Sequence, residues 1–213
     1  MAPRLCVVTS RRRLGLSCSD LIRRIAWLAS AGVDLVQIRE RDLPDRELTA
    51  LVRDAVAATR AAPAQVVVND RFDIAMAADA AGVHLREDSV SIDRVRSIAP
   101  REFLIGCSVH DIDRARVLSA CDYLLFGTVF PSSGKPAGHP IAGLEMLRAV
   151  CAAARRPVLA IGGVHAGNAR AAMRGGAAGV AAIESLLSVT SAQQAQDTVA
   201  AFRAASAEVN REG

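Results

Sequence analysis

Cationic, amide and hydroxyl side chains recur in this sequence directly after short apolar runs. The run 123–126 leads into a turn that combines two serines, a glycine and a lysine, Ser132-Ser133-Gly134-Lys135. Glycine lets the backbone approach a ligand closely, the hydroxyls offer hydrogen bonds, and lysine adds a positive charge on a long stem. The turn suits an anionic ligand, although an ordinary exposed loop explains it equally well when it is taken alone.

The run 35–39 alternates apolar and polar residues. Gln37 and Arg39 occupy alternate positions, and strand side chains alternate between two faces, so both are predicted to point into the same interior. An unpaired guanidinium is costly to bury, and its fork of N–H donors suits a phosphate group. We therefore predict that Arg39 binds a phosphate; an internal ion pair with Asp70 or Glu40 is the alternative.

Acidic residues follow two neighbouring apolar runs. Asp70 comes directly after 65–69, and Asp88, next to Glu87, comes shortly after 82–85. Carboxylate oxygens at adjacent strand ends suit Mg2+ bridged to a diphosphate. The predicted metal ligands are Asp70 and Asp88, and Glu87 is the alternative to Asp88. The alternative role for Asp70 is a cap on the helix that starts after it.

Gly162-Gly163 follows the apolar run 158–161. In barrels of alternating strands and helices, the loops after strands seven and eight often bind phosphate through backbone N–H groups, and side chains would block that approach. We predict this role for the first glycine pair and a helix C-cap for the second, Gly175-Gly176. A plain turn is the alternative for Gly162-Gly163.

His84 and His110 also lie at predicted strand ends. Histidine titrates near neutral pH and can act as an acid or a base, but a lone histidine in such a position is more often a hydrogen-bonded wall residue. Both interpretations stay open for these two residues.

The elements that must position these residues alternate regularly along the chain. The predicted strands are 5–9, 35–39, 65–69, 82–85, 103–108, 123–126, 158–161 and 180–183, and the predicted helices are 21–31, 44–56, 72–78, 92–98, 112–120, 143–154, 168–174 and 192–205. Such strands pair in parallel through right-handed crossovers, and eight units predict a closed (β/α)8 TIM barrel, a single domain over residues 1–213. An open Rossmann-like or flavodoxin-like sheet is the alternative, but no GxGxxG motif follows the first strand. The segment from Ser206 onward is predicted to be a frayed polar tail.

Composition excludes several classes of protein. Hydrophobic residues make up 51% of the chain, enough for a substantial core, whereas aromatic residues make up 3%, too few for a platform that stacks single-stranded nucleic acid. The net charge of +4 is spread over helical patterns; the Arg11-Arg12-Arg13 cluster is interpreted as a loop near an anion site or as plain surface. No apolar run approaches the ~20 residues of a membrane span.

Five cysteines without CxxC spacing indicate reduced structural thiols, which predicts a cytoplasmic protein. An alanine-rich helical exterior would permit a homodimer, but the sequence identifies no interface. The predicted partners are therefore small phosphorylated molecules rather than nucleic acid or membrane.

Six segments, taken in order, resemble the motifs of the thiamine phosphate synthase and thiazole tautomerase family. They are Val36-Gln-Ile-Arg-Glu-Arg41, Val68-Asn-Asp-Arg71, Gly82-Val-His-Leu85, Gly106-Cys-Ser-Val-His110, Asp122-Tyr-Leu-Leu-Phe-Gly-Thr-Val-Phe-Pro131 and Ala160-Ile-Gly-Gly-Val164. Each motif alone is weak evidence for the family, but the six motifs in this order are specific to it. The resemblance implies a (β/α)8 barrel and, for the synthase, the Mg2+-assisted joining of hydroxymethylpyrimidine diphosphate to a carboxythiazole phosphate, with release of diphosphate and CO2.

The resemblance also implies roles for individual residues. The positions that fall where the synthase binds the pyrimidine diphosphate are Gln37, Arg39, Asn69, Ser108 and Lys135. Asp70 falls on a Mg2+ ligand, and Arg41 keeps the charge of a lysine. The implied reaction is dissociative, so charge neutralisation and alignment are expected to supply most of the catalysis. The residues predicted to act in catalysis are Arg39, Ser108 and Lys135, and those predicted to bind substrate are Gln37, Arg39, Arg41, Asn69, Ser108, Ser132, Ser133, Lys135, Gly163 and Ile183.

Departures from the family's pattern bear on the activity. Arg86-Glu-Asp-Ser89 replaces Gly-Gln-Glu-Asp, which puts Ser89 at the second Mg2+ ligand unless Asp88 takes that role. Gly134 removes one hydroxyl from the turn before Lys135. Glu184 replaces a serine and brings a charge that repels phosphate unless the carboxylate turns away.

Two other activities are compatible with this sequence. A thiazole tautomerase would need neither diphosphate nor Mg2+ and could use His84, His110 or Glu184 for proton transfer, but the histidine that the tautomerase uses after strand six falls at Thr128. A non-catalytic binder of thiamine precursors would keep the anion site alone. The retained Asn69-Asp70 pair and Lys135 favour the synthase.

Overall fold

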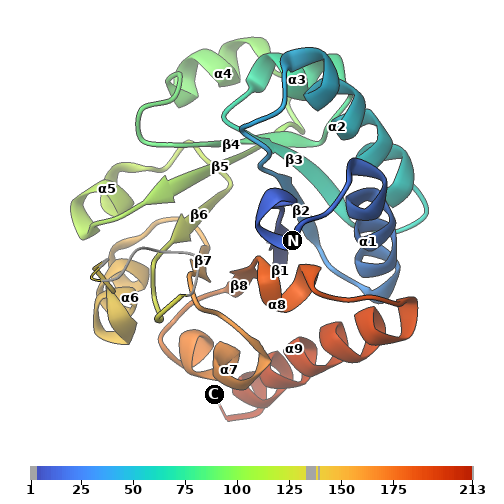
Figure 1. Ribbon diagram of the computed structural model, residues 1–213. Helices are drawn as coiled ribbons and strands as arrows, with labels where there is room; N and C mark the ends of the chain where they lie inside the picture. Colours follow the sequence, from blue (N-terminus) through green and yellow to red (C-terminus); the bar gives the residue numbers. More distant parts are fainter. Residues whose placement is uncertain (1–3, 133–137, 139, 213) are drawn as a thin grey trace.

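Eight parallel strands form a closed barrel in the computed structural model, which describes residues 4–132, 138 and 140–212 (Figure 1). The strands follow one another around the barrel in chain order, and β1 pairs with β8 to close it. They are β1 (Leu5–Val8), β2 (Leu35–Ile38), β3 (Gln65–Asn69), β4 (Gly82–Leu85), β5 (Leu104–Val109), β6 (Tyr123–Phe126), β7 (Val158–Ile161) and β8 (Gly179–Ala182). The predicted (β/α)8 TIM barrel is confirmed.

Most helices surround the barrel on its outside, and the two shortest lie over one end of it (Figure 1). They are the 3-10 helix η1 (Arg12–Leu14) and α1 (Cys18–Ala31), α2 (Asp45–Thr59), α3 (Phe72–Ala77), α4 (Ile92–Ile98), α5 (Ile112–Val117), α6 (Gly143–Ala153), α7 (Ala166–Arg174), α8 (Glu184–Leu187) and α9 (Ala192–Glu212). The side chains of Ser17, Ser91 and Asp111 accept hydrogen bonds from the first turns of α1, α4 and α5. These caps satisfy N–H groups that have no partner within the helix. Within the described residues, no helix combines the length and the apolar character that a membrane span requires.

Three elements differ from the prediction. Helix α9 continues through the segment from Ser206 that we expected to fray, because no glycine or proline interrupts a run of helix-compatible residues there. The helices η1 and α8 were not expected, since runs of three and four residues are too short to show a helical period. Several strand ends also lie one residue away from their predicted positions, so Arg39 and Ile183 sit just beyond the ends of β2 and β8.

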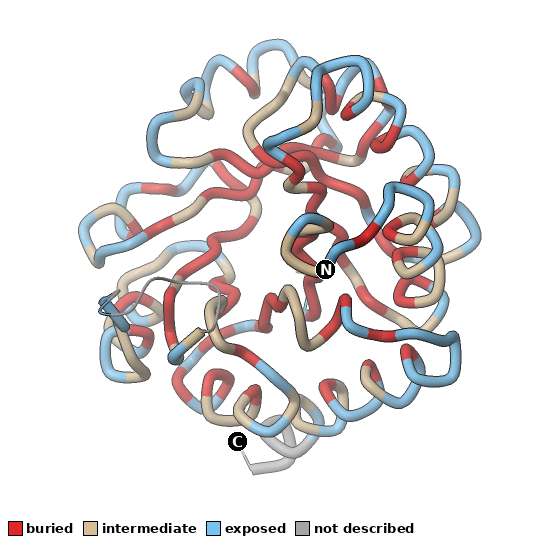
Figure 2. Tube along the Cα trace, in the orientation of Figure 1, coloured by how far each residue is buried: buried red, intermediate tan, exposed pale blue. Residues whose placement is uncertain are grey.

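The core has two parts, one inside the barrel and one between the barrel and its helices. The interior part consists of Cys6, Val8, Leu35, Val67, Tyr123, Leu125, Leu159 and Ala181. Figure 2 shows the strands buried and the outer helix faces exposed. The ring of Tyr123 fits inside because of Gly106, where an added Cβ would lie only 2.1 Å from the ring carbon Cζ. Towards the C-terminal ends of the strands, the side chains inside the barrel become polar.

Candidate functional site

A cavity of about 670 Å³ lies where the C-terminal ends of the strands meet. The predicted residues that it brings together are Gln37, Arg39, Arg41, Asn69, Asp88, Ser108, Ser132 and Ile183. Gly163 lines an adjoining cavity of about 250 Å³ that shares Ser132 and Ile183. Asp70 lines another, of about 170 Å³, that shares Arg39, Arg41 and Asn69. Ser133 and Lys135 lie outside the described residues.

The amide of Gln37 marks the floor of the main cavity. Its Nε2 donates a hydrogen bond of 3.1 Å to Oδ1 of Asn69, so β2 and β3 hold each other's amides in place. Its Oε1 is buried and has no hydrogen-bond donor among the described residues. An unsatisfied buried acceptor is costly, so this atom is suited to a donor supplied by a ligand.

His84 forms part of the cavity wall and orients Ser108. Its Nε2 lies 2.9 Å from Oγ of Ser108, and its Nδ1 lies 3.2 Å from the hydroxyl of Tyr123. Only 1% of His84 is exposed. Burial, followed by the positive charge of Arg39, lowers the pKa of His84 to about 3. The imidazole is therefore neutral near pH 7, and its contacts are those of a hydrogen-bonded wall residue.

The buried imidazole predicts a specific loss of stability in acid. Because the pKa of His84 is lowered from 6.5 to about 3, its contribution is complete above pH 6.5 and is lost as the pH falls from 6.5 towards 3. Between pH 7.5 and 5.0, the free energy of unfolding should fall by about 2 kcal/mol more in the wild type than in His84→Asn. Urea denaturation at the two pH values measures this, and equal losses in both proteins would contradict it.

Two arginines at the end of β2 carry uncompensated charge into the site. The backbone N–H of Arg39 donates to Oγ1 of Thr9 at 2.9 Å, which fixes the chain where it leaves the strand. Burial, and then the charge of Arg41, lowers the pKa of the Arg39 guanidinium. Within the described part of the chain, neither arginine makes an ion pair. The carboxylate of Glu40 instead accepts from the backbone of Arg11, so the alternative of an internal ion pair for Arg39 is not observed.

Asp70 and Asp88 are both engaged by the guanidinium of Arg86. Nη1 of Arg86 lies 3.4 Å from Oδ2 of Asp70, and Nη2 lies 2.6 Å from Oδ2 of Asp88. The hydroxyl of Ser89 donates to Oδ1 of Asp70 and accepts from the backbone N–H of Arg86 at 2.7 Å. Helix α3 is preceded instead by Arg71 and has no side-chain cap, so Asp70 does not play the alternative capping role.

This arrangement does not fit the Mg2+ site that the resemblance implies. Mg2+ in a phosphate site is bound by one or two carboxylates together with water and phosphate oxygens, whereas the carboxylates of Asp70 and Asp88 already share the guanidinium of Arg86. Among the described residues, no three His, Cys, Asp or Glu side chains form a group that could hold a metal ion. Ser89 offers a neutral hydroxyl, and that hydroxyl is itself bonded to Asp70.

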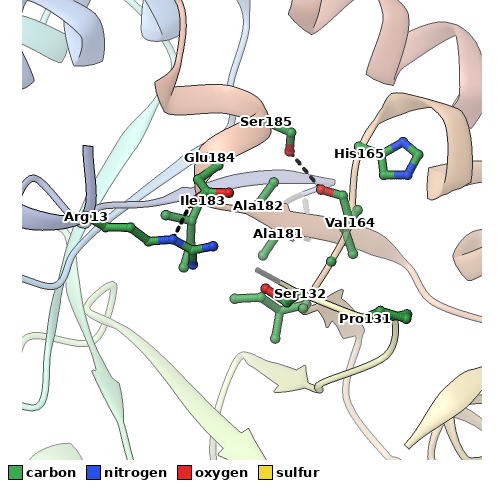
Figure 3. A pocket seen from close by; sticks show the side chains of 13 residues that line it. Arg13, Pro131, Ser132, Val164, His165, Ala181, Ala182, Ile183, Glu184 and Ser185 are labelled. Atoms are coloured by element: carbon green, nitrogen blue, oxygen red, sulfur yellow. Dashed lines mark hydrogen bonds and ion pairs between the residues drawn. The ribbon is translucent and has the colours of Figure 1, made fainter. Parts of the chain in front are cut away.

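The opposite end of the site combines glycine backbone and small side chains with the charged side chains of Arg13 and Glu184 (Figure 3). Gly163 has a φ of +62°, and an added Cβ would lie 2.1 Å from the carbonyl oxygen of Pro131. The hydroxyl of Ser185 donates to the carbonyl of Val164 at 2.7 Å, which ties α8 to the loop after β7. A short helix after strand eight, facing the loop after strand seven, is the usual phosphate site of this fold.

Glu184 lies at this end of the site, and its negative charge is paired with a cation. Its carboxylate accepts a hydrogen bond from Nε of Arg13, which comes from η1 after β1 (Figure 3). The repulsion that we expected between Glu184 and a phosphate is thus reduced by a neighbouring cation. Arg13, the third residue of the Arg11-Arg12-Arg13 cluster, lines both cavities, so the role of this cluster near an anion site stays a prediction.

Three residues that shape the site are not among the predicted catalytic, substrate-binding or metal-binding residues. Arg13 was noted only as part of a charged cluster, Thr9 was assigned to a strand, and Arg86 was placed at a strand end as a departure. The position of Arg86 directly after β4 was the available signal, since strand ends carry ligand-binding residues in this fold.

Comparison with known proteins identifies the family of this chain. Residues 5–186 match the family described as thiamine monophosphate synthase. The chain is 35% identical to the thiamine-phosphate synthase of Roseiflexus sp. strain RS-1 over 184 residues, 85% of this chain and 77% of the relative. It is 36% identical to that of Moorella thermoacetica over 184 residues, 85% of this chain and 86% of the relative. The structure of thiamine phosphate pyrophosphorylase from Pyrococcus furiosus is similar, with a TM-score of 0.79 and 32% identity over 97% of this chain and 96% of that one. The chain therefore belongs to the thiamine monophosphate synthase family.

Proposed function

We propose that the protein joins hydroxymethylpyrimidine diphosphate to a carboxythiazole phosphate and so forms thiamine phosphate, diphosphate and CO2. One observation supports the proposal: two adjoining cavities have differently built ends, and each end suits an anionic group. Arg39 and Arg41, which make no ion pair among the described residues, lie at one end, and the Gly163 loop with α8 and Arg13 forms the other. A diphosphate and a monophosphate are the two anionic groups that this reaction brings together.

The floor of the cavity suits the pyrimidine ring. The buried Oε1 of Gln37 needs a donor, and the exocyclic amino group of an aminopyrimidine is one. Asn69 holds the Gln37 amide in position for that contact. Ser108, oriented by neutral His84, would direct its hydroxyl at the pyrimidine diphosphate.

In the proposed reaction, the bond between the pyrimidine methylene carbon and the diphosphate oxygen breaks, and its electron pair leaves with diphosphate. The thiazole nitrogen then donates its lone pair to the methylene carbon. Loss of CO2 leaves an electron pair on the thiazole ring carbon, which takes a proton from water. Arg39 and Arg41 stabilise the charge that develops on the leaving group, so the site requires no nucleophilic side chain.

The test is incubation of the purified protein with both substrates, followed by chromatography of thiamine phosphate and assay of released diphosphate. We expect the two products in equal amounts. Aromatisation of the thiazole substrate without the pyrimidine would identify a tautomerase instead. Tight binding of both substrates without turnover would identify a non-catalytic binder.

A further inference from the structure

We infer that Arg86 stands in this protein where a divalent cation would otherwise bridge Asp70 and Asp88, so that the diphosphate is held by arginines without a bound metal. The inference rests on the proposed function, since it concerns how that function's diphosphate is neutralised. It follows from contacts of Arg86 that the sequence does not reveal.

The contacts of Arg86 are those of a bridging cation. One guanidinium nitrogen approaches Asp70 and another approaches Asp88, at 3.4 and 2.6 Å. A divalent ion bound to the same two carboxylates would lie beside the guanidinium, and the two positive charges would repel each other. The two carboxylates therefore hold either the guanidinium or a divalent ion. Because Arg86 is part of the chain, its guanidinium is always there to occupy that position.

Arg86 also faces the same space as Arg39 and Arg41, the two arginines that follow β2. Arg39, Arg41 and Arg86 line both the main cavity and the smaller cavity next to Asp70. A guanidinium has five N–H donors, and Arg86 uses only some of them in its hydrogen bonds to Asp70 and Asp88. The remaining donors of Arg86 are in position to meet a diphosphate bound at Arg39, with Asp70 and Asp88 holding the guanidinium in place.

Ser89 supplies no carboxylate at the position where the resemblance implies the second Mg2+ ligand. Its hydroxyl is neutral, donates to Asp70 and accepts from the backbone of Arg86. These bonds tie the loop after β4 to the end of β3 around Arg86. The loop is thus organised around the guanidinium.

Calorimetric titration with inorganic diphosphate, in EDTA and in MgCl2, tests the inference. For the wild type we expect binding in EDTA to be as tight as in MgCl2, within threefold. Arg86→Gln should weaken binding in EDTA at least tenfold, and MgCl2 should then tighten it at least threefold, because Asp70 and Asp88 become available to a metal. Arg86→Lys, which keeps the charge, should lose less than Arg86→Gln.

The matched control is Arg116→Gln, which removes the same charge from an exposed arginine paired with Asp113 on α5. It should bind diphosphate as the wild type does. Circular dichroism melting of each variant separates loss of binding from loss of fold. Wild-type binding that is more than threefold tighter in MgCl2, or an Arg86→Gln variant that binds normally in EDTA or gains nothing from MgCl2, would overturn the inference alone. Absence of diphosphate binding by the wild type in both buffers would overturn the proposed function as well.

Discussion

Arg39→Ala is expected to weaken the binding of inorganic diphosphate at least about 100-fold, a loss on the order of 2.7 kcal/mol. The guanidinium of Arg39 is half-buried beside Arg41, and it makes no ion pair among the described residues. Its removal deletes the central cation of the site without exposing an internal partner, so the barrel should stay folded. Calorimetric titration measures the affinity, and thermal melting checks the fold.

Arg94→Ala is the control for Arg39→Ala, because it removes the same charge from an exposed position on α4. Its affinity for diphosphate should match that of the wild type. If Arg39→Ala binds diphosphate within threefold of the wild type, the anion lies elsewhere and the assignment of the β2 end is wrong.

Gly163→Ala is expected to destabilise the protein by about 3 kcal/mol or more and to abolish binding of the phosphorylated thiazole at practical concentrations. The added methyl would meet the carbonyl oxygens of Pro131 and Phe130 at 2.1 and 2.7 Å. Both are backbone atoms, so relief requires a shift of the loop that carries Ser132. Urea denaturation gives the free energy of unfolding, and titration with carboxythiazole phosphate gives the affinity.

Gly15→Ala separates steric overlap from backbone strain. Gly15 has the same φ of +62° as Gly163, but an added Cβ there has no atom within 4 Å. It should cost only the strain of a left-handed alanine, about 1 kcal/mol. Equal losses in the two variants would show that the loop around Gly163 yields without damage to the site.

The fold was accessible from the sequence because a TIM barrel repeats one local pattern. The strands are short runs of mostly apolar, buried residues, and the longer helices show an amphipathic period. Elements without such a signal could not be predicted. Helix α8, for example, has only four residues, which is too short to show a helical period. The end of α9 was also predicted wrongly, because polar composition alone does not end a helix when no residue in it breaks the backbone pattern.

The sequence by itself determined which residues gather in the cavity, since parallel strands bring their C-terminal ends to one face of the barrel and Gln37, Arg39, Asn69 and Ser108 all follow that rule. Only the tertiary structure decided which charges meet. Arg86 forms ion pairs with both Asp70 and Asp88, and Arg13 pairs with Glu184, which lies 171 residues away in the sequence. Such pairings depend on loop paths and on distances of a few Å, and neither is encoded in the periodicity that specifies strands and helices.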